Sequence, residues 1–258
     1  MSAGLRILSR QHGIQVQSGL CALGVMTKAP QPGRVKTRLT PPLTPAEAAE
    51  LNSCFLRDTA GAIQWAATRS AAMGVGVYTP VGAEQAYRGI LPEEFCLIAQ
   101  RGDGFGERLA FAVEDLLEAG FASVCLIDSD SPTVPERAYA DAADWLAQPG
   151  DRIVFGPSDD GGYYLIGMKQ CHLALFERID WSTDRVAEQT LSRAAELQLS
   201  VKTLPTWYDV DDRQTLRRLC AELLGDEAKS SGYHAENTRN YLTRIVQIEG
   251  RDRIWPNE

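Results

Sequence analysis

The chain has 258 residues, of which 44% are hydrophobic and 23% are charged. This is the composition of an ordinary globular protein, and the length suffices for one large α/β domain with a buried core. The formal net charge of −8 argues against non-specific nucleic-acid binding.

Two further features concern location. No apolar run approaches the roughly 18 residues of a membrane span, and the first twenty residues lack the apolar stretch of a signal peptide. The six cysteines are widely spaced and form no C-x-x-C pair. We therefore expect reduced thiols in a cytoplasmic protein without a membrane or nucleic-acid partner.

Short apolar runs alternate with helical patterns along the chain, which is typical of a mostly parallel sheet with crossover helices. The predicted strands are Cys21–Thr27, Val75–Tyr78, Phe95–Ala99, Val124–Ile127, Ile153–Phe155, Tyr163–Met168 and Val201–Leu204. The predicted helices are Pro45–Ala67, Phe105–Ala119, Pro135–Ala147, Thr183–Leu197 and Gln214–Leu224.

Two of these helices carry start signals. Thr44 is the expected N-cap of the first helix, with Pro45 at the first helical position and Glu47 closing a capping box. Thr133 and Glu136 predict a second capping box at the helix that begins near Pro135.

The chain divides into three parts. We expect an N-terminal extension at 1–19, one α/β domain at 20–224 and a C-terminal helical appendage at 225–258. In the appendage, a polar link at 226–232 precedes a helix with Leu242, Ile245 and Val246 on one face.

A basic loop follows the first predicted strand. Against the acidic background, it gathers four cations within eleven residues, namely Lys28, Arg34, Lys36 and Arg38. The alternative is a solvated loop, but two prolines and a glycine favour a loop of defined shape. Because ligands of open α/β sheets bind beyond the carboxyl ends of the strands, the position favours phosphate binding.

Asp128 and Asp130 form a D-x-D pattern at the end of the fourth predicted strand, followed by a Ser131-Pro132 turn. A hard ion such as Mg²⁺ takes one or two carboxylates together with phosphate oxygens. The alternative is a capping turn before the next helix. We expect metal binding, with Asp130 as the principal ligand.

A second acidic segment, YDVDD at 208–212, precedes a predicted helix. Aspartate is a preferred N-cap, so Asp211 or Asp212 can simply start the helix. One aspartate can cap while another coordinates, and we assign Asp211 to the metal.

The segment FGPSDDGGYYLIGM at 155–168 places Asp159 and Asp160 before Gly161 and Gly162, between two strand-like runs. Glycine permits close backbone approach to a ligand or a positive φ. Adjacent carboxylates raise each other's pKa unless a cation intervenes. The candidate roles are a metal ligand, a general base or an Asx turn.

The segment WSTD supplies Trp181, Ser182 and Thr183 as acceptor-side candidates, although these hydroxyls can also cap the following helix. The three histidines show no metal-ligand spacing. Neither a Walker A motif nor a complete dinucleotide-binding glycine pattern is present.

Taken in order, KAPQPGRVKTRL, the strand-end DSP, GPSDDGGYYLIGM, WST and DVDDRQTL resemble the family DUF2064, also called transferase 1, rSAM/selenodomain-associated. That family belongs to the nucleotide-diphospho-sugar transferase superfamily. The resemblance covers about residues 20–222 and implies a GT-A-like, Rossmann-like three-layer sandwich with a mostly parallel central sheet. The family usually has glycine at the position of Asp128, so the resemblance supports Asp130 as the acid.

The chain is also similar to the guanylyltransferases of deazaflavin-cofactor synthesis, which share a basic K-x-R-L segment. The family label favours glycosyl transfer from a nucleotide-diphosphate sugar. Four cations in one loop favour nucleotidyl transfer from a triphosphate to a small phosphorylated or phosphonate acceptor. We expect glycosyl transfer to a small acceptor, with nucleotidyl transfer as the alternative.

In either chemistry we expect Mg²⁺ or Mn²⁺ to act as a Lewis acid on the leaving group. Asp160, with Asp159 beside it, is the candidate for orienting or deprotonating the acceptor, and Gly161 and Gly162 let the nucleotide approach. The expected partners are a nucleotide or nucleotide-sugar donor and a small-molecule acceptor. A homo-oligomer is compatible with the sequence. Titratable acids at three ligand-edge turns argue against a non-enzymatic nucleotide-binding module, because simple nucleotide binding needs fewer.

Overall fold

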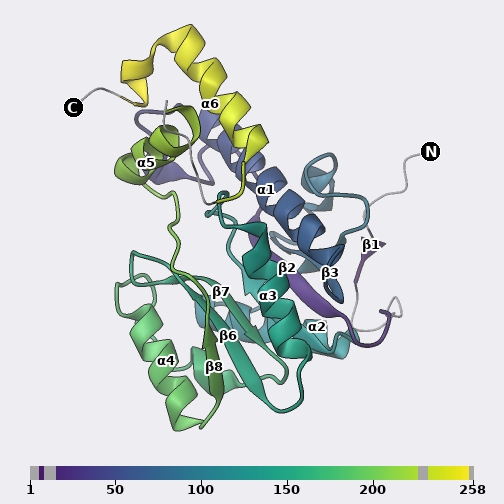
Figure 1. Cartoon of the computed structure of the whole chain (residues 1–258). Coiled ribbons are helices and arrows are strands. Elements are labelled where there is room, and N and C mark those ends of the chain that lie inside the picture. Colours follow the sequence, from purple (N-terminus) through teal and green to yellow (C-terminus); the bar gives the residue numbers. More distant parts are fainter. Residues whose placement is uncertain (1–5, 9–15, 226–231, 256–258) are drawn as a thin grey trace.

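The computed structural model describes residues 6–8, 16–225 and 232–255. In this part of the chain, one eight-stranded sheet has the order β1-β4-β3-β2-β5-β7-β6-β8 (Figure 1). Its strands are β1 (Arg6–Ile7), β2 (Cys21–Lys28), β3 (Ala72–Thr79), β4 (Cys96–Ala99), β5 (Ser123–Ile127), β6 (Arg152–Pro157), β7 (Tyr163–Met168) and β8 (Ser200–Thr203). All neighbouring strands are parallel except at β7, which runs antiparallel to β5 and β6.

The helices are α1 (Pro45–Ala67), α2 (Phe105–Glu118), α3 (Glu136–Ala147), α4 (Val186–Glu196), α5 (Arg213–Leu224) and α6 (Glu236–Glu249). Short 3-10 helices lie at Thr37–Leu39, Glu84–Tyr87, Leu173–Phe176 and Arg251–Arg253. None of the helices in the described residues is long and apolar enough to cross a bilayer.

Helices cover both faces of the sheet. One core packs α1 and α3 against it, with Leu56, Ile63 and Tyr139 fully buried. The other core packs α2 and α4 against the opposite face through residues such as Val113 and Ala194. The expected α/β three-layer sandwich with a mostly parallel sheet is therefore confirmed.

Local signals place the start of α1 correctly. The Thr44 hydroxyl accepts a hydrogen bond from the Glu47 amide, and the Glu47 carboxylate accepts one from the Thr44 amide. The predicted capping box at α3 is wrong. The Thr133 hydroxyl instead donates to Glu222 and accepts from the Trp207 indole, and Pro135 occupies the N-cap position.

Described segments near both ends of the chain join the main body. β1 lies within the segment expected as an extension and pairs with β4. α6 lies beside α1 and α5, where Leu242 and Ile245 share a third core with Phe55 (Figure 1). Most of the expected polar link, 226–232, lies outside the described residues.

A buried carboxylate on α1 fastens this C-terminal helix. Asp58 is 2% exposed and accepts hydrogen bonds from the Asn237 and Thr238 amides at 3.0 and 2.8 Å, within the first turn of α6. Asp58 therefore caps α6 across the interface, where a negative charge also favours the positive end of the helix dipole.

We expect Asp58→Ala to lower the free energy of unfolding by about 1–3 kcal/mol, because two backbone amides and a side-chain amide lose their acceptor. Urea titration measures this loss. Glu50→Ala removes a half-exposed carboxylate from the same helix and should cost less than about 0.5 kcal/mol. Equal losses in the two variants would contradict a capping role for Asp58.

Candidate functional site

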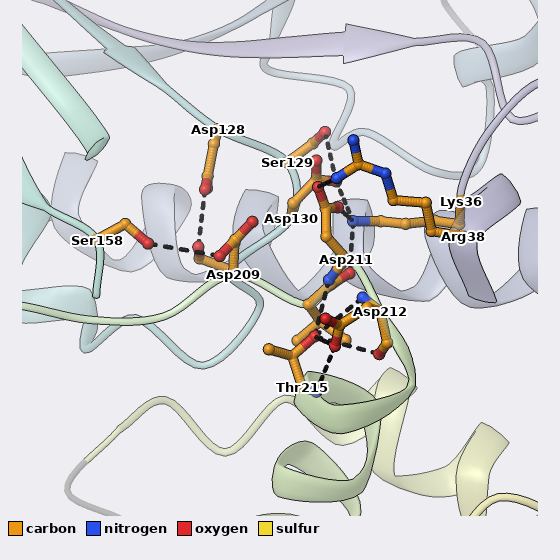
Figure 2. A network of polar contacts seen from close by, with 12 residues as sticks. Lys36, Arg38, Asp128, Ser129, Asp130, Ser158, Asp209, Asp211, Asp212 and Thr215 are labelled. Carbon is orange, nitrogen blue, oxygen red and sulfur yellow. Dashed lines mark hydrogen bonds and ion pairs between the residues drawn. The ribbon is translucent and has the colours of Figure 1, made fainter. Parts of the chain in front are cut away.

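Four loops meet beyond the carboxyl ends of β2, β5 and β6. They are the basic loop after β2, the Asp128–Pro132 turn after β5, the Ser158–Gly162 turn between β6 and β7, and the segment before α5 (Figure 2). The Val210 amide donates to the Asp130 carbonyl at 3.0 Å, and the Trp207 amide donates to Pro157 at 3.0 Å. These backbone bonds hold the acidic segments together, as expected at the ligand-binding edge of such a sheet.

Lys36 crosses from the basic loop to two acidic segments. Its ammonium lies 2.7 Å from Asp130 Oδ1 and 2.9 Å from Asp211 Oδ1, and it donates to the Val210 carbonyl at 2.8 Å (Figure 2). The side chain is 4% exposed. Burial alone would lower the pKa of Lys36, but the charges of Asp130 and Asp211 outweigh burial and raise the pKa.

An ammonium has three N–H donors, and these three contacts occupy all of them. Lys36 therefore lines the phosphate-side cavity while its charge is already balanced by two carboxylates. Asp212 has the other role expected for this acidic segment, the N-cap of α5: its carboxylate accepts a hydrogen bond from the Thr215 amide at 2.8 Å.

The basic loop encloses a cavity of about 260 Å³. It is lined by all four predicted cations, Lys28, Arg34, Lys36 and Arg38, together with Asn52, Ser129, Asp130 and Asp211. Among the described residues, Lys28 and Arg34 form no ion pair, and Arg38 lies 4.0 Å from Asp211 with its side chain 75% exposed. The cavity thus offers three cations to an anionic ligand.

A second cavity of about 470 Å³ adjoins the first and shares Arg38, Asp130 and Asp211 with it. Its other walls combine carboxylates and aromatic rings, from Asp128, Asp160, Asp184, Asp209, Phe105, Tyr163 and Trp181. The structure thereby brings the predicted phosphate, metal and acceptor residues to one continuous site.

Two carboxylates of this second cavity are poorly compensated. Burial, followed by the charges of Asp130 and Asp209, raises the pKa of Asp128 well above its usual range. Burial, followed by the charges of Asp160 and Asp211, raises the pKa of Asp209 to about 6. Asp128 Oδ1 is buried without a hydrogen-bond partner in the described part of the chain.

A divalent cation suits this donor set. Within the described ranges, no three His, Cys, Asp or Glu side chains are arranged as a complete metal site. Mg²⁺ needs only one or two carboxylates when phosphate oxygens complete its shell. The unpartnered Asp128 oxygen and the carboxylate of Asp209 meet that requirement, whereas Asp130 and Asp211 already share Lys36.

The two glycines and two aspartates of the β6–β7 turn make different contacts: only one of each pair lines the second cavity. Asp160 lines the second cavity and accepts from the Gly162 amide at 2.8 Å, forming an Asx turn. Asp159 pairs with Arg218, whose guanidinium stacks on Tyr208, and does not line either cavity.

Gly162 lines the second cavity, but Gly161 does not. Gly161 has a φ of +88°, and a Cβ there would lie 2.1 Å from the Asp184 carbonyl oxygen. Its own carbonyl accepts from the Ala187 amide at 2.8 Å. Gly161 therefore packs the turn against the start of α4.

The WST segment lies on the wall of the second cavity. Trp181 packs edge-to-face on Phe105 with ring centroids 5.1 Å apart. Ser182 has a φ of +64°, and the Thr183 hydroxyl donates to the Asp180 carbonyl at 2.7 Å. Thr183 thus stabilises the turn that presents Trp181.

Sequence reasoning did not assign Asp209, Asn52, Phe105 or Tyr163 to the site. Asp209 was indistinguishable from its two neighbouring aspartates. Asn52 is 4% exposed on α1, and its Oδ1 has no hydrogen-bond partner within the part of the chain that the structure describes; a polar residue between Leu51 and Phe55 was the available signal. Nothing in the sequence singles out the two aromatic residues from core positions.

Comparison with known proteins agrees with this architecture. Residues 63–183 match the family model DUF2064, "Uncharacterized protein conserved in bacteria". A crystal structure from Desulfovibrio desulfuricans G20, provisionally described as a nucleotide-diphospho-sugar transferase, is 28% identical with a TM-score of 0.75. The match covers 90% of this chain and 96% of that one.

CMP:2-keto-3-deoxy-manno-octonic acid synthetase, solved with CTP, shares the fold at 12% identity and a TM-score of 0.51, over 80% of this chain and 98% of that one. No curated protein matches the chain significantly. The description of the Desulfovibrio structure agrees with the predicted enzyme class, a nucleotide-dependent transferase. The resemblance predicted from the motifs is thereby confirmed: the chain matches DUF2064 over residues 63–183 and has the fold of nucleotide-diphospho-sugar transferases.

Proposed function

We propose that this protein is a metal-dependent glycosyltransferase that moves a sugar from a nucleotide-diphosphate sugar to a small acceptor. The observation that carries the proposal is the pair of adjoining cavities, one lined by cations and one by carboxylates and aromatic rings, which share Arg38, Asp130 and Asp211. A donor diphosphate in the first cavity would place its transferable group at the entrance of the second.

The charges of the first cavity argue less strongly for a triphosphate than the sequence of the basic loop did. Four cations in the loop suggested a triphosphate, but Lys36 is balanced by Asp130 and Asp211. Three cations then remain for the donor, and one divalent ion adds two further charges. The loop thus offers one cation fewer than its sequence suggested, which weakens the argument for a triphosphate and leaves a diphosphate compatible with the cavity.

The proposed metal is Mg²⁺ or Mn²⁺, which Asp128 and Asp209 would hold, with Asp130 beside them. When bound, it would supply a Lewis acid for the leaving group of the donor. Arg34 and Arg38 would bind phosphate oxygens. Lys36 would hold Asp130 and Asp211 in position, since it contacts both.

Asp160 is the proposed base. In the transfer step, the acceptor hydroxyl oxygen forms a bond to the anomeric carbon while the bond from that carbon to the phosphate oxygen breaks. The bonding electrons leave with the nucleoside diphosphate, and the hydroxyl proton passes to Asp160. We place the protein in the cytoplasm, which is consistent with six cysteines that are all free thiols.

Slow donor turnover to water in the presence of Mn²⁺ tests the proposal. We expect free nucleoside diphosphate and free sugar from one nucleotide-diphosphate sugar, and no pyrophosphate from nucleoside triphosphates. Pyrophosphate release from one triphosphate, with every nucleotide sugar intact, would instead establish nucleotidyl transfer. Nucleotide binding without any product would indicate a regulatory module.

A further inference from the structure

We propose that the acceptor is an uncharged, hydroxyl-rich small molecule without a phosphate or carboxylate group, bound in the second cavity between its carboxylates and its aromatic wall. The inference rests on the proposed transferase function and names its substrate class.

The charge of the cavity excludes an anionic acceptor. Six carboxylates line it, while Arg38 is the cation among its described lining residues; the acids are Asp128, Asp130, Asp160, Asp184, Asp209 and Asp211. Lys36 balances one charge of this set from outside the wall, and one divalent ion would balance two more. A negative field would remain, and it would repel a phosphate ester.

Carboxylates accept hydrogen bonds and donate none when ionised. They therefore suit a ligand that supplies several O–H donors, whereas a phosphate group offers only acceptors to them. Asp160 and Asp184 are both exposed on the wall of the cavity and available for such contacts.

The aromatic residues of the cavity wall add apolar surface to the polar surface of the carboxylates. Phe105 is 53% exposed although it is a large apolar side chain, and it forms an edge-to-face pair with Trp181. Tyr163 adds a ring whose hydroxyl is buried without a hydrogen-bond partner among the described residues. Apolar rings and carboxylates on the walls of one cavity match a molecule with C–H surfaces and a hydroxyl-bearing rim, such as a sugar or polyol ring.

Matched compounds test the class of acceptor directly. Binding of glucose, myo-inositol and glycerol is compared with that of their monophosphates by ligand-observed NMR, on the full chain with Mg²⁺ and without donor. We expect at least one parent compound to bind about 10-fold or more tightly than its phosphate ester. Tighter binding of the phosphate esters, or binding of neither class, would overturn the proposal.

A variant pair separates the local charge from the total charge of the protein. Asp184→Asn removes one carboxylate from the cavity wall and should improve phosphate-ester binding about 2- to 5-fold. Asp141→Asn makes the same change at an exposed site on α3, where Asp141 faces Arg137, and should have no effect. Equal improvement in both variants would contradict a cavity effect.

The donor assay keeps the two proposals apart. If the parent compounds bind but no donor releases a product with them, the transferase function fails while the ligand class holds. If a donor is consumed faster with phosphate esters than with the parent compounds, the function holds and the ligand class is wrong.

Discussion

Lys36→Met is expected to reduce donor turnover about 100-fold and to lower the free energy of unfolding by about 1–3 kcal/mol. Without the ammonium, Asp130 and Asp211 repel each other and three loops lose their common contact. Removing one partner of a buried ion pair costs 3–5 kcal/mol in general, but water screens these carboxylates, which are 36% and 44% exposed. A displacement of about 1 Å in a site suffices for a 100-fold loss of rate.

Arg34→Met is the matched control. It removes a cation from the same loop and the same cavity, at a side chain without an ion pair among the described residues. We expect weaker donor binding, by roughly 1.5–3 kcal/mol, and an unchanged unfolding free energy. If Lys36→Met behaves like Arg34→Met, losing donor affinity but neither stability nor turnover at saturating donor, then Lys36 is only a phosphate ligand.

Asp209→Asn is expected to stabilise the protein at neutral pH by about 1–2 kcal/mol, because solvent screening reduces the roughly 3 kcal/mol of the full pKa shift, and to reduce metal-dependent turnover at least about 10-fold. Burial and the neighbouring acids raise the pKa of Asp209 from 3.8 to about 6. A raised carboxyl pKa contributes stability that is fully present below about pH 4 and is lost as pH rises through about 6. The variant avoids this loss, because asparagine does not ionise.

Denaturation between pH 4 and 8 measures this effect, and the stability curves of wild type and variant should converge near pH 4. Mg²⁺ should stabilise the wild type more than the variant at pH 7. Asp141→Asn serves as the control, with no pH-dependent difference expected at an exposed site. A variant that is destabilised equally at both ends of the range would show that the fold compensates the ionised Asp209.

Local sequence determined most of the secondary structure. α1 begins at the predicted residue because Thr44, Pro45 and Glu47 satisfy its first turn within a few positions of the chain. The alternation of strands and helices likewise determined the layers. The carboxyl-end rule then brought the basic loop and the acidic turns to one edge of the sheet.

The secondary-structure predictions that were wrong or missing have long-range causes. The Thr133 hydroxyl contacts Trp207 and Glu222, which lie 74 and 89 positions away, and therefore does not cap α3. β1 has only two residues and forms through its pairing with β4, so no periodic pattern in the sequence predicts it.

Long-range contacts also decided the roles of the charged residues. Four cations in one loop are equivalent in sequence, and so are the three aspartates at 209, 211 and 212. Only the tertiary structure buries Lys36 against Asp130 and Asp211, 94 and 175 positions along the chain, and turns Asp159 towards Arg218. Residue type determined which groups can carry charge, whereas burial and distant partners decided which charges remain available to a ligand, because solvation and Coulomb energies depend on position in space.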